Sequence, residues 1–433
     1  MSQLSLVVRQ ASAIAAGLLV LSCANSWAQS QDQSASSVAR ENQVLESAPS
    51  ANDAGHMQPV VVKSREELER LLASGPTVLD NLTPYGKREL LQSLSWGRRG
   101  LGGFSPAAPL RELNREQALA IYELLGVRQY FPKIFSTAPT IRLDDVSPQC
   151  AQLVEQFKAV IRENELEKSR GENTSSNSSW VPSTQFYRVR VKPLMHAQKL
   201  SRMSNSDVYL LFDMANEASF TLNSPSAVQD MKSIYRVFEQ RGIDTRRGVD
   251  NTMLQALIRH RDLKAAQQFI TEHREFADRK LPVLLDRIGH VRHRPTVLVD
   301  QGDAWVRTLA PFNRDKAQLV IVLSESCGFC RKFMSDLEAD EALRQHLERA
   351  ETMMLSAPGD GDPFEFVKRW NSTHENLRMY VPNKISEWKG FDSGRVPQFL
   401  IVRNGKILHS SFGWQKDGSS KVELLDQLAK FGL

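Results

Sequence analysis

The chain has 433 residues, of which 41% are hydrophobic and 24% are charged, and this composition is ordinary for a globular protein. The length suits two or three domains, and the formal net charge at pH 7 is +5. Four cysteines are too few for a fold that is held together mainly by disulfides. Composition therefore excludes a disulfide scaffold and leaves the functional class open.

The N-terminal residues resemble a secretory signal peptide. Arg9 supplies positive charge, Ala13–Leu21 is an apolar segment too short to span a bilayer stably, and residues 26–28 form a small-x-small cleavage site. We therefore expect cleavage after Ala28 and export to the periplasm, where disulfides persist. The alternative is a lipoprotein signal, in which Cys23 would carry a lipid anchor.

Changes in composition along the chain predict how it divides into parts. The predicted parts are a signal peptide at 1–28, a disordered linker at 29–58, a mostly helical domain at 59–168, a linker at 169–183, a helix-rich middle domain at 184–291 and a final domain at 292–433. Both linkers are rich in polar residues such as Ser and Asn, so they can bury little apolar surface. The regions between them carry apolar residues at helical spacing.

Two patterns compete in the middle domain. Apolar residues at helical spacing predict helices within 225–242 and 250–285. Gln185–Lys192 instead alternates between two sets of side chains, and this period predicts a two-faced strand. The middle domain is therefore expected to be mostly helical with at least one strand.

Other residues outside the final domain carry weaker signals. The arginines of the middle domain are expected to lie on solvated helix faces, because an exported protein meets little nucleic acid and no aromatic residues are interleaved with them. His290 and His293 lack further ligands, so no metal or other cofactor is predicted. Cys150 is expected to be a small buried residue, and the alternatives are a relay to Cys327 or an intermolecular disulfide.

The most informative stretch is Leu319–Phe333. It begins as a buried strand, continues through a short polar turn and two cysteines separated by two residues, and ends as an amphipathic helix. Cys327 is therefore expected at a helix N-terminus, where unpaired N–H groups and the helix dipole favour a nucleophilic thiolate. Cys330 lies one helical turn further on, close enough to form a disulfide with Cys327 or to resolve a mixed disulfide.

A second stretch, Gly394–Leu408, combines a Val396–Pro397 bond with a hairpin pattern. An Asn404-Gly405 pair between two apolar runs predicts the hairpin turn. Together, the two stretches resemble the thioredoxin-like superfamily over about the last third of the chain. An extra strand and helix expected between them are typical of the TlpA-like branch, and Val-Pro at this place also occurs in periplasmic disulfide-bond (Dsb) proteins.

This resemblance implies a thioredoxin-like domain with a redox-active disulfide between Cys327 and Cys330. It also implies that Pro397 is cis and faces the cysteines, and that Val396 presents its backbone to the substrate chain. The sequence departs from the family where Ser326 replaces its usual tryptophan. It departs again upstream, because Ile321 and its apolar neighbours stand where the family has a buried acid that assists proton transfer. That role is therefore expected to be missing or to come from elsewhere.

We predict an α+β multidomain protein, with mostly helical N-terminal and middle regions followed by a thioredoxin-like α/β domain with a mixed sheet. The predicted function is that of an exported thiol–disulfide oxidoreductase with Cys327 and Cys330 as catalytic residues. Its expected partners are protein thiols or disulfides of the cell envelope and a membrane or soluble redox partner. The alternative is a non-catalytic assembly protein of an envelope complex that uses the same fold as a scaffold. The direction of electron flow stays open.

Overall fold

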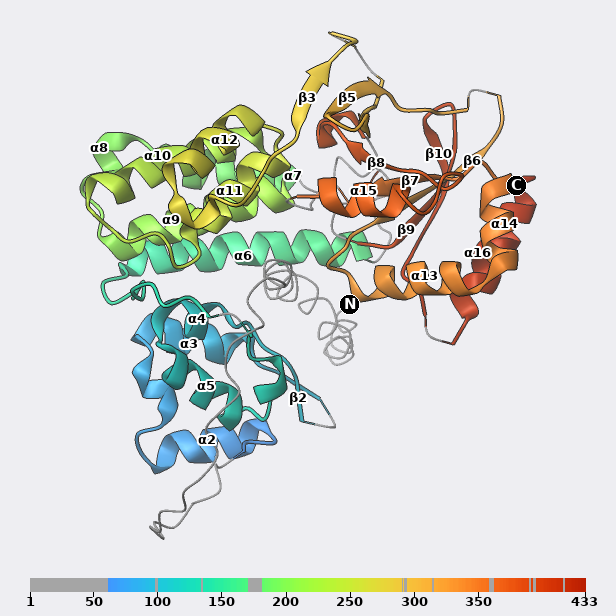
Figure 1. The fold of residues 1–433 in the computed structure, drawn as a ribbon. Helices are drawn as coiled ribbons and strands as arrows, with labels where there is room; N and C mark the ends of the chain where they lie inside the picture. The colour runs from blue at the N-terminus through green and yellow to red at the C-terminus, as the bar shows by residue number, and fades with distance from the viewer. Residues whose placement is uncertain are drawn as a thin grey trace, which may run out of the picture. The chain divides into compact units, whose positions relative to one another are not determined.

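The computed structural model describes residues 61–433 apart from 98–99, 134, 170–180, 290, 292–293, 314, 358–361, 389–390, 392–394 and 416. The chain divides into two compact units, one ending at Asp144 and the other running from Asp145 to Leu433 (Figure 1). The predicted signal peptide, Cys23 and the predicted linker at 29–58 lie outside the described residues, as do His290 and His293. The domain boundaries inferred from composition stay predictions.

The first unit is mostly helical and surrounds an apolar core. Its elements are α2 (Arg65–Ser74), η1 (Val78–Asn81), α3 (Pro84–Ser93), β1 (Ser95–Gly97), β2 (Gly100–Gly103), α4 (Ala107–Glu112), α5 (Arg115–Leu124) and η2 (Arg128–Tyr130). Ser64, Thr83 and Asn114 begin α2, α3 and α5, because each side chain accepts a backbone N–H of the following turn. Leu113 and Ile121 are fully buried in the core.

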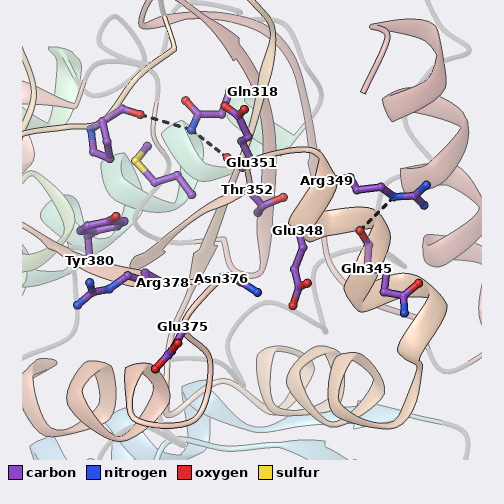
Figure 2. Close-up of a pocket in the computed structure, with 12 residues that line it drawn as sticks. Gln318, Gln345, Glu348, Arg349, Glu351, Thr352, Glu375, Asn376, Arg378 and Tyr380 are labelled. Carbon is purple, nitrogen blue, oxygen red and sulfur yellow. Dashed lines mark hydrogen bonds between the residues drawn. The ribbon is translucent and has the colours of Figure 1, made fainter.

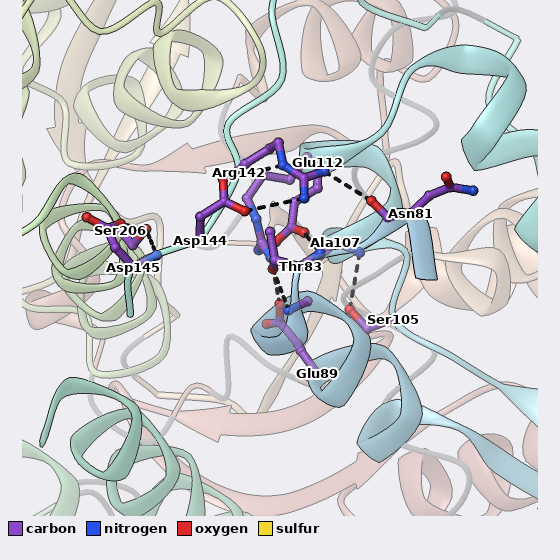
Figure 3. Close-up of polar contacts among 12 residues, drawn as sticks. Asn81, Thr83, Glu89, Ser105, Ala107, Glu112, Arg142, Asp144, Asp145 and Ser206 are labelled. Carbon is purple, nitrogen blue, oxygen red and sulfur yellow. Dashed lines mark hydrogen bonds and ion pairs between the residues drawn. The ribbon is translucent and has the colours of Figure 1, made fainter. Parts of the chain in front are cut away.

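A buried carboxylate ties the start of α3 to the end of α4 (Figure 3). The Glu112 side chain is buried and accepts a hydrogen bond from the Thr83 backbone N–H at 2.9 Å. Arg111 pairs with this carboxylate at 2.8 Å and with that of Glu89 at 3.0 Å. Glycine is required at Gly86, because a Cβ there would lie 2.6 Å from both carboxylate oxygens of Glu112. Removing one partner would leave a buried charge uncompensated, so the network fixes how α3 and α4 pack.

The second unit begins with helices. They are α6 (Pro148–Ser169), α7 (Val181–Phe186), η3 (Tyr187–Val191), η4 (Lys192–Leu194), α8 (Ala197–Leu200), α9 (Asn205–Thr221), α10 (Pro225–Gln240), α11 (Val249–Arg259), α12 (Leu263–Glu272) and η5 (Arg274–Phe276). Phe212 of α9 and Phe238 of α10 pack with their ring centres 5.8 Å apart. The prediction of a helical middle region is confirmed. In the part of the chain that the structure describes, no helix is long and apolar enough to cross a membrane.

One prediction for this region is wrong, because Gln185–Lys192 is helical and not a strand. Helix α7 runs directly into the π-helical turn η3. Tyr187 and Val191, four residues apart, are 3% and 0% exposed, whereas Val189 between them is 52% exposed. A strand would place all three side chains on one face, so the burial follows the helical period. The Tyr187 hydroxyl also donates a hydrogen bond to the Asp230 carboxylate at 2.9 Å, which holds η3 against α10.

The remainder of the second unit is built on an eight-stranded sheet with the order β10-β9-β6-β7-β8-β4-β5-β3. The strands are β3 (Val283–Asp286), β4 (Thr296–Asp300), β5 (Ala304–Leu309), β6 (Gln318–Leu323), β7 (Met353–Ser356), β8 (Met379–Pro382), β9 (Gln398–Arg403) and β10 (Lys406–Phe412). β6, β7 and β8 pair in parallel, whereas β9 pairs antiparallel with both β6 and β10. The predicted α+β class with a C-terminal mixed sheet is confirmed.

Helices cover the central strands of this sheet. They are α13 (Gly328–Ala339), α14 (Glu341–Arg349), α15 (Phe364–Asn371) and α16 (Ser419–Lys430). Phe333 of α13 packs against Phe399 of β9 with ring centres 5.3 Å apart, so α13 lies on the face that carries Phe399. Val320, Leu355 and Leu400 point to the opposite face, where they belong to a second buried cluster. β6 is therefore buried on both faces, so packing on both sides fixes the position of its C-terminal end.

Replacing Val191 and Val189 separately with alanine tests the helical assignment of η3. We expect V191A to lower the free energy of unfolding by about 2 kcal/mol, because it leaves a cavity in the core. V189A should change it by less than about 0.5 kcal/mol, because that side chain is already exposed. Chemical denaturation followed by circular dichroism measures both. Equal losses in the two variants would mean that the two side chains share one buried face, as in a strand.

Candidate functional site

The end of β6 and the start of α13 position the two cysteines. After the last residue of β6 the chain turns, and the Cys327 backbone N–H donates to the Ser324 carbonyl at 3.3 Å. Cys327 is the N-cap of α13, where its sulfur accepts a hydrogen bond from the Cys330 backbone N–H at 3.4 Å. Cys330 is fully buried in the first turn of the helix, and its sulfur accepts a hydrogen bond from the Ser324 backbone N–H at 3.4 Å. Both cysteines are free thiols, and only Cys327 reaches the surface.

The surroundings of Cys327 favour its thiolate. Its pKa is lowered to about 6, first by a hydrogen bond from the Cys330 thiol, and desolvation by burial acts against this shift. The backbone N–H groups of Cys330 and Phe329 lower the pKa further, and the Arg331 guanidinium adds to the effect. At neutral pH most of Cys327 is therefore the nucleophilic thiolate.

The loop before β9 closes the site from the other side. The Val396–Pro397 peptide bond is cis, and the Val396 carbonyl oxygen accepts a hydrogen bond from the Cys327 thiol at 3.2 Å. The Pro397 carbonyl accepts a hydrogen bond from the Gly413 N–H at 2.9 Å, which holds this loop against the end of β10. The structure thus brings Cys327, Cys330, Val396 and Pro397 together. Because a carbonyl oxygen can accept a hydrogen bond only from the protonated sulfur, it opposes the N–H donors.

The resemblance in the sequence puts Ile321 and its apolar neighbours where the thioredoxin-like superfamily has a buried acid. In the structure Ile321 is fully buried in β6. Glu325 is the acidic residue nearest to Cys327 in the sequence, but it forms an ion pair with Arg369 and both side chains are largely exposed. Glu325 therefore belongs to the solvated rim of the site, as the sequence indicates.

Sequence reasoning misses three other features of the site. Phe329, between the cysteines, is 52% exposed. The Arg395 guanidinium lies 4.2 Å from the centre of the Phe412 ring, in the same region as the Val396–Pro397 loop. The Ser324 and Ser326 hydroxyls are 2.9 Å apart in the turn that leads to Cys327. Of these, only the serines give a local signal, as two small polar residues between a buried strand and a helix.

Cys150 lies in α6, and its side chain points into the protein interior. It is buried, and its thiol donates a weak hydrogen bond to the Asp207 carbonyl at 3.8 Å. Burial raises its pKa to about 12, and the nearby Asp207 carboxylate adds to this shift. A thiol in this environment is inert at neutral pH. Cys150 is therefore the small buried residue that the sequence predicts.

A cavity of about 730 Å³ lies elsewhere on the sheet (Figure 2). It is bordered by Gln318 and Met353, the first residues of β6 and β7, so it lies at the opposite end of these strands from Cys327. Glu348, Glu351 and Arg349 add charges of both signs to its lining. Among the described residues, no group of three or more His, Cys, Asp and Glu side chains is arranged to hold a metal ion. The cavity is therefore separate from the dithiol site and offers no cation cage.

No protein-family model matches the chain, and no curated protein matches its sequence. Among solved structures, the chain is similar to a thioredoxin-like protein from Bacteroides caccae ATCC 43185, with 12% sequence identity. The match covers 67% of this chain and 98% of the other, with a TM-score of 0.23. At that score the likeness carries no argument about function. In the C-terminal part, the mixed sheet carries the dithiol after β6 and the cis-proline before β9, as the prediction of a thioredoxin-like domain expects.

The lowered pKa of Cys327 predicts how its reactivity changes with pH. We expect its rate of alkylation by iodoacetamide to rise to a midpoint near pH 6 and then level off, because only the thiolate reacts. An ordinary cysteine would have its midpoint at about pH 8.5. Peptide mass spectrometry follows the modified residue, with C327S as the control and Cys150 expected to stay unmodified. A midpoint at or above about pH 8.5 would mean that neither the Cys330 thiol nor the backbone N–H groups stabilise the thiolate.

Proposed function

We propose that this protein is an exported thiol–disulfide oxidoreductase that exchanges disulfides with proteins of the cell envelope. The observation that carries the chemistry is the Cys327 sulfur, which has a lowered pKa, caps α13 and lies within hydrogen-bond distance of the Val396 carbonyl. Export and a periplasmic location rest on the N-terminal sequence alone. No cofactor is needed, because the two thiols supply both electrons.

The exchange takes two steps. The Cys327 thiolate attacks one sulfur of a substrate disulfide, so that a mixed disulfide forms, the substrate S–S bond breaks and one substrate thiolate leaves. Cys330 then loses its proton and attacks the Cys327 sulfur. A Cys327–Cys330 disulfide forms, and the second substrate thiolate is released. The protein is oxidised by two electrons and the substrate is reduced by two, and the reverse sequence oxidises a substrate dithiol.

The surface around Cys327 suits an extended protein segment. Val396 and Pro397 offer backbone next to the sulfur, and Phe329, two residues after Cys327, adds a half-exposed apolar side chain. Arg395 extends over Phe412 beside this loop and contributes positive charge. A flexible peptide around a cysteine can use all three contacts.

A non-catalytic assembly role is the second candidate. Its support is that the helical part of the second unit is joined to the thioredoxin-like part by specific contacts. The Arg261 guanidinium donates to the Pro382 carbonyl at 3.3 Å and lies 5.5 Å from the Phe364 ring centre. Arg279 pairs with Asp362 at 3.1 Å. Such a connection would let the helices present the redox part to a partner, and this role is compatible with catalysis.

Replacing Cys330 with serine should trap the substrates. C330S keeps the attacking thiolate of Cys327 but removes the thiol that resolves the mixed disulfide, so we expect disulfide-linked complexes to accumulate. Non-reducing electrophoresis of envelope extracts, followed by mass spectrometry, would reveal them. C327S is the matched control and should trap nothing. If C330S and C327S give the same pattern, the dithiol does not exchange with envelope proteins.

The reduction potential of the Cys327–Cys330 pair would assign the direction of electron flow. A pKa near 6 at Cys327 stabilises the reduced form relative to thioredoxin, whose nucleophile has a pKa of about 7. We therefore expect a potential above the roughly −270 mV of thioredoxin and below the roughly −120 mV of the strongest oxidant of the superfamily. Equilibration with glutathione and quantification of both forms measures it. A pair that never exchanges with glutathione would favour the assembly role.

A further inference from the structure

The proton of Cys330 needs a route out of the protein during the exchange reaction. In the reduced site, the Cys330 thiol donates its proton in a hydrogen bond to the Cys327 thiolate. Once Cys327 enters a mixed disulfide, its sulfur loses its negative charge and is no longer a good acceptor. Cys330 is fully buried, so direct transfer of its proton to solvent at neutral pH is slow. Ile321 cannot accept it, and Glu325 is held at the rim by Arg369.

Ser324 lies directly against the Cys330 sulfur. Its backbone N–H donates to that sulfur at 3.4 Å, and the whole residue is buried at the end of β6. Its hydroxyl is 2.9 Å from the hydroxyl of Ser326, and either oxygen can donate in this contact. Ser326 is partly exposed in the turn before Cys327. The two hydroxyls therefore connect Ser324, whose backbone contacts the buried sulfur, to the partly exposed Ser326.

A third serine keeps the same region polar. Ser356 pairs with Leu323 across β6 and β7, so it is level with the residue just before Ser324. It shares a sheet face with Ile321 and Phe399, which is the face that α13 covers. Ser356 is fully buried, and its hydroxyl has no hydrogen-bond partner among the described residues. A buried hydroxyl without a hydrogen-bond partner is destabilising, and this one adds polarity to the sheet face that α13 covers.

We propose that the hydroxyls of Ser324 and Ser326 relay the proton of Cys330 to solvent when the mixed disulfide is resolved. The Cys330 S–H bond breaks as its proton moves to the Ser324 oxygen, the Ser324 proton moves to Ser326, and Ser326 releases a proton to water. The Cys330 thiolate then attacks Cys327 as described above. This inference rests on the proposed function, and it assigns Ser324 and Ser326 to the second step alone. The proposed step needs no contact between either serine and the substrate, so we assign them as positioning and relay residues for Cys330.

Reaction with an aromatic disulfide that releases thionitrobenzoate separates the two steps. The reduced wild-type protein should release one equivalent quickly as Cys327 attacks and a second equivalent as Cys330 resolves the mixed disulfide. We expect S324A to leave the first phase unchanged and to slow the second by about tenfold at pH 7, which is modest for the loss of a proton-transfer group. S324A keeps the backbone N–H donor to Cys330, so only the hydroxyl is tested. S324T, which keeps a hydroxyl, should resolve at nearly the wild-type rate, and S326A should slow the second phase as well.

The pH dependence distinguishes a relay from a structural defect. Hydroxide takes over the role of the relay at high pH, so the gap between S324A and wild type should narrow as pH rises. A second phase that is unchanged in S324A would overturn the relay. So would equal slowing of both phases, or a gap that stays constant with pH. If the wild-type protein itself releases no second equivalent, the oxidoreductase proposal fails, and that result differs from every failure of the relay alone.

Discussion

The hydrogen bond from the Cys330 backbone N–H to the Cys327 sulfur is the interaction on which the site depends. It makes Cys327 the N-cap of α13, a position that Ser, Thr, Asp or Asn usually occupies. The same sulfur therefore starts the helix and receives the stabilisation that a helix N-terminus gives to an anion. The two roles agree, because a charged acceptor makes a stronger hydrogen bond than a neutral one. The low pKa of Cys327 thus comes first from the hydrogen bond of the Cys330 thiol and then from the backbone N–H groups where this helix begins.

The pairing of β6 with β9 explains why two distant stretches meet at this sulfur. The strands are antiparallel, and Val322 pairs with Gln398, so the start of β9 lies beside the end of β6. The residues just before β9, Val396 and Pro397, must then lie beside the turn that leads to Cys327. One carbonyl oxygen consequently faces the sulfur and favours the thiol, while several N–H donors favour the thiolate. The donors outweigh the carbonyl oxygen, so the sulfur stays reactive. Its reactivity still depends on which group hydrogen-bonds to the Val396 carbonyl.

Local patterns predicted the parts of this fold that local physics decides. The apolar run of β6 is too hydrophobic to be exposed, and it is buried. Asn404 and Gly405 both adopt the positive φ that a tight hairpin turn needs. The alternation in Gln185–Lys192 led to the wrong prediction of a strand. The basic residues between its apolar positions are compatible with an exposed helix face as well as with a strand. Partners across the sheet decide the rest. The contact between Arg395 and Phe412 follows from the pairing of β9 with β10, and no period in the sequence encodes it.

An isoleucine at position 321 has consequences for both cysteines. A buried carboxylate there would cost free energy to desolvate, and its negative charge would raise the pKa of a nearby thiol. Ile321 removes both effects, which agrees with a pKa of about 6 at Cys327. An apolar side chain at this position cannot accept the Cys330 proton, and a neutral hydroxyl can only pass a proton on to the next group. The site thus favours a stable nucleophile in the first step and makes the second step depend on access to solvent through Ser324 and Ser326.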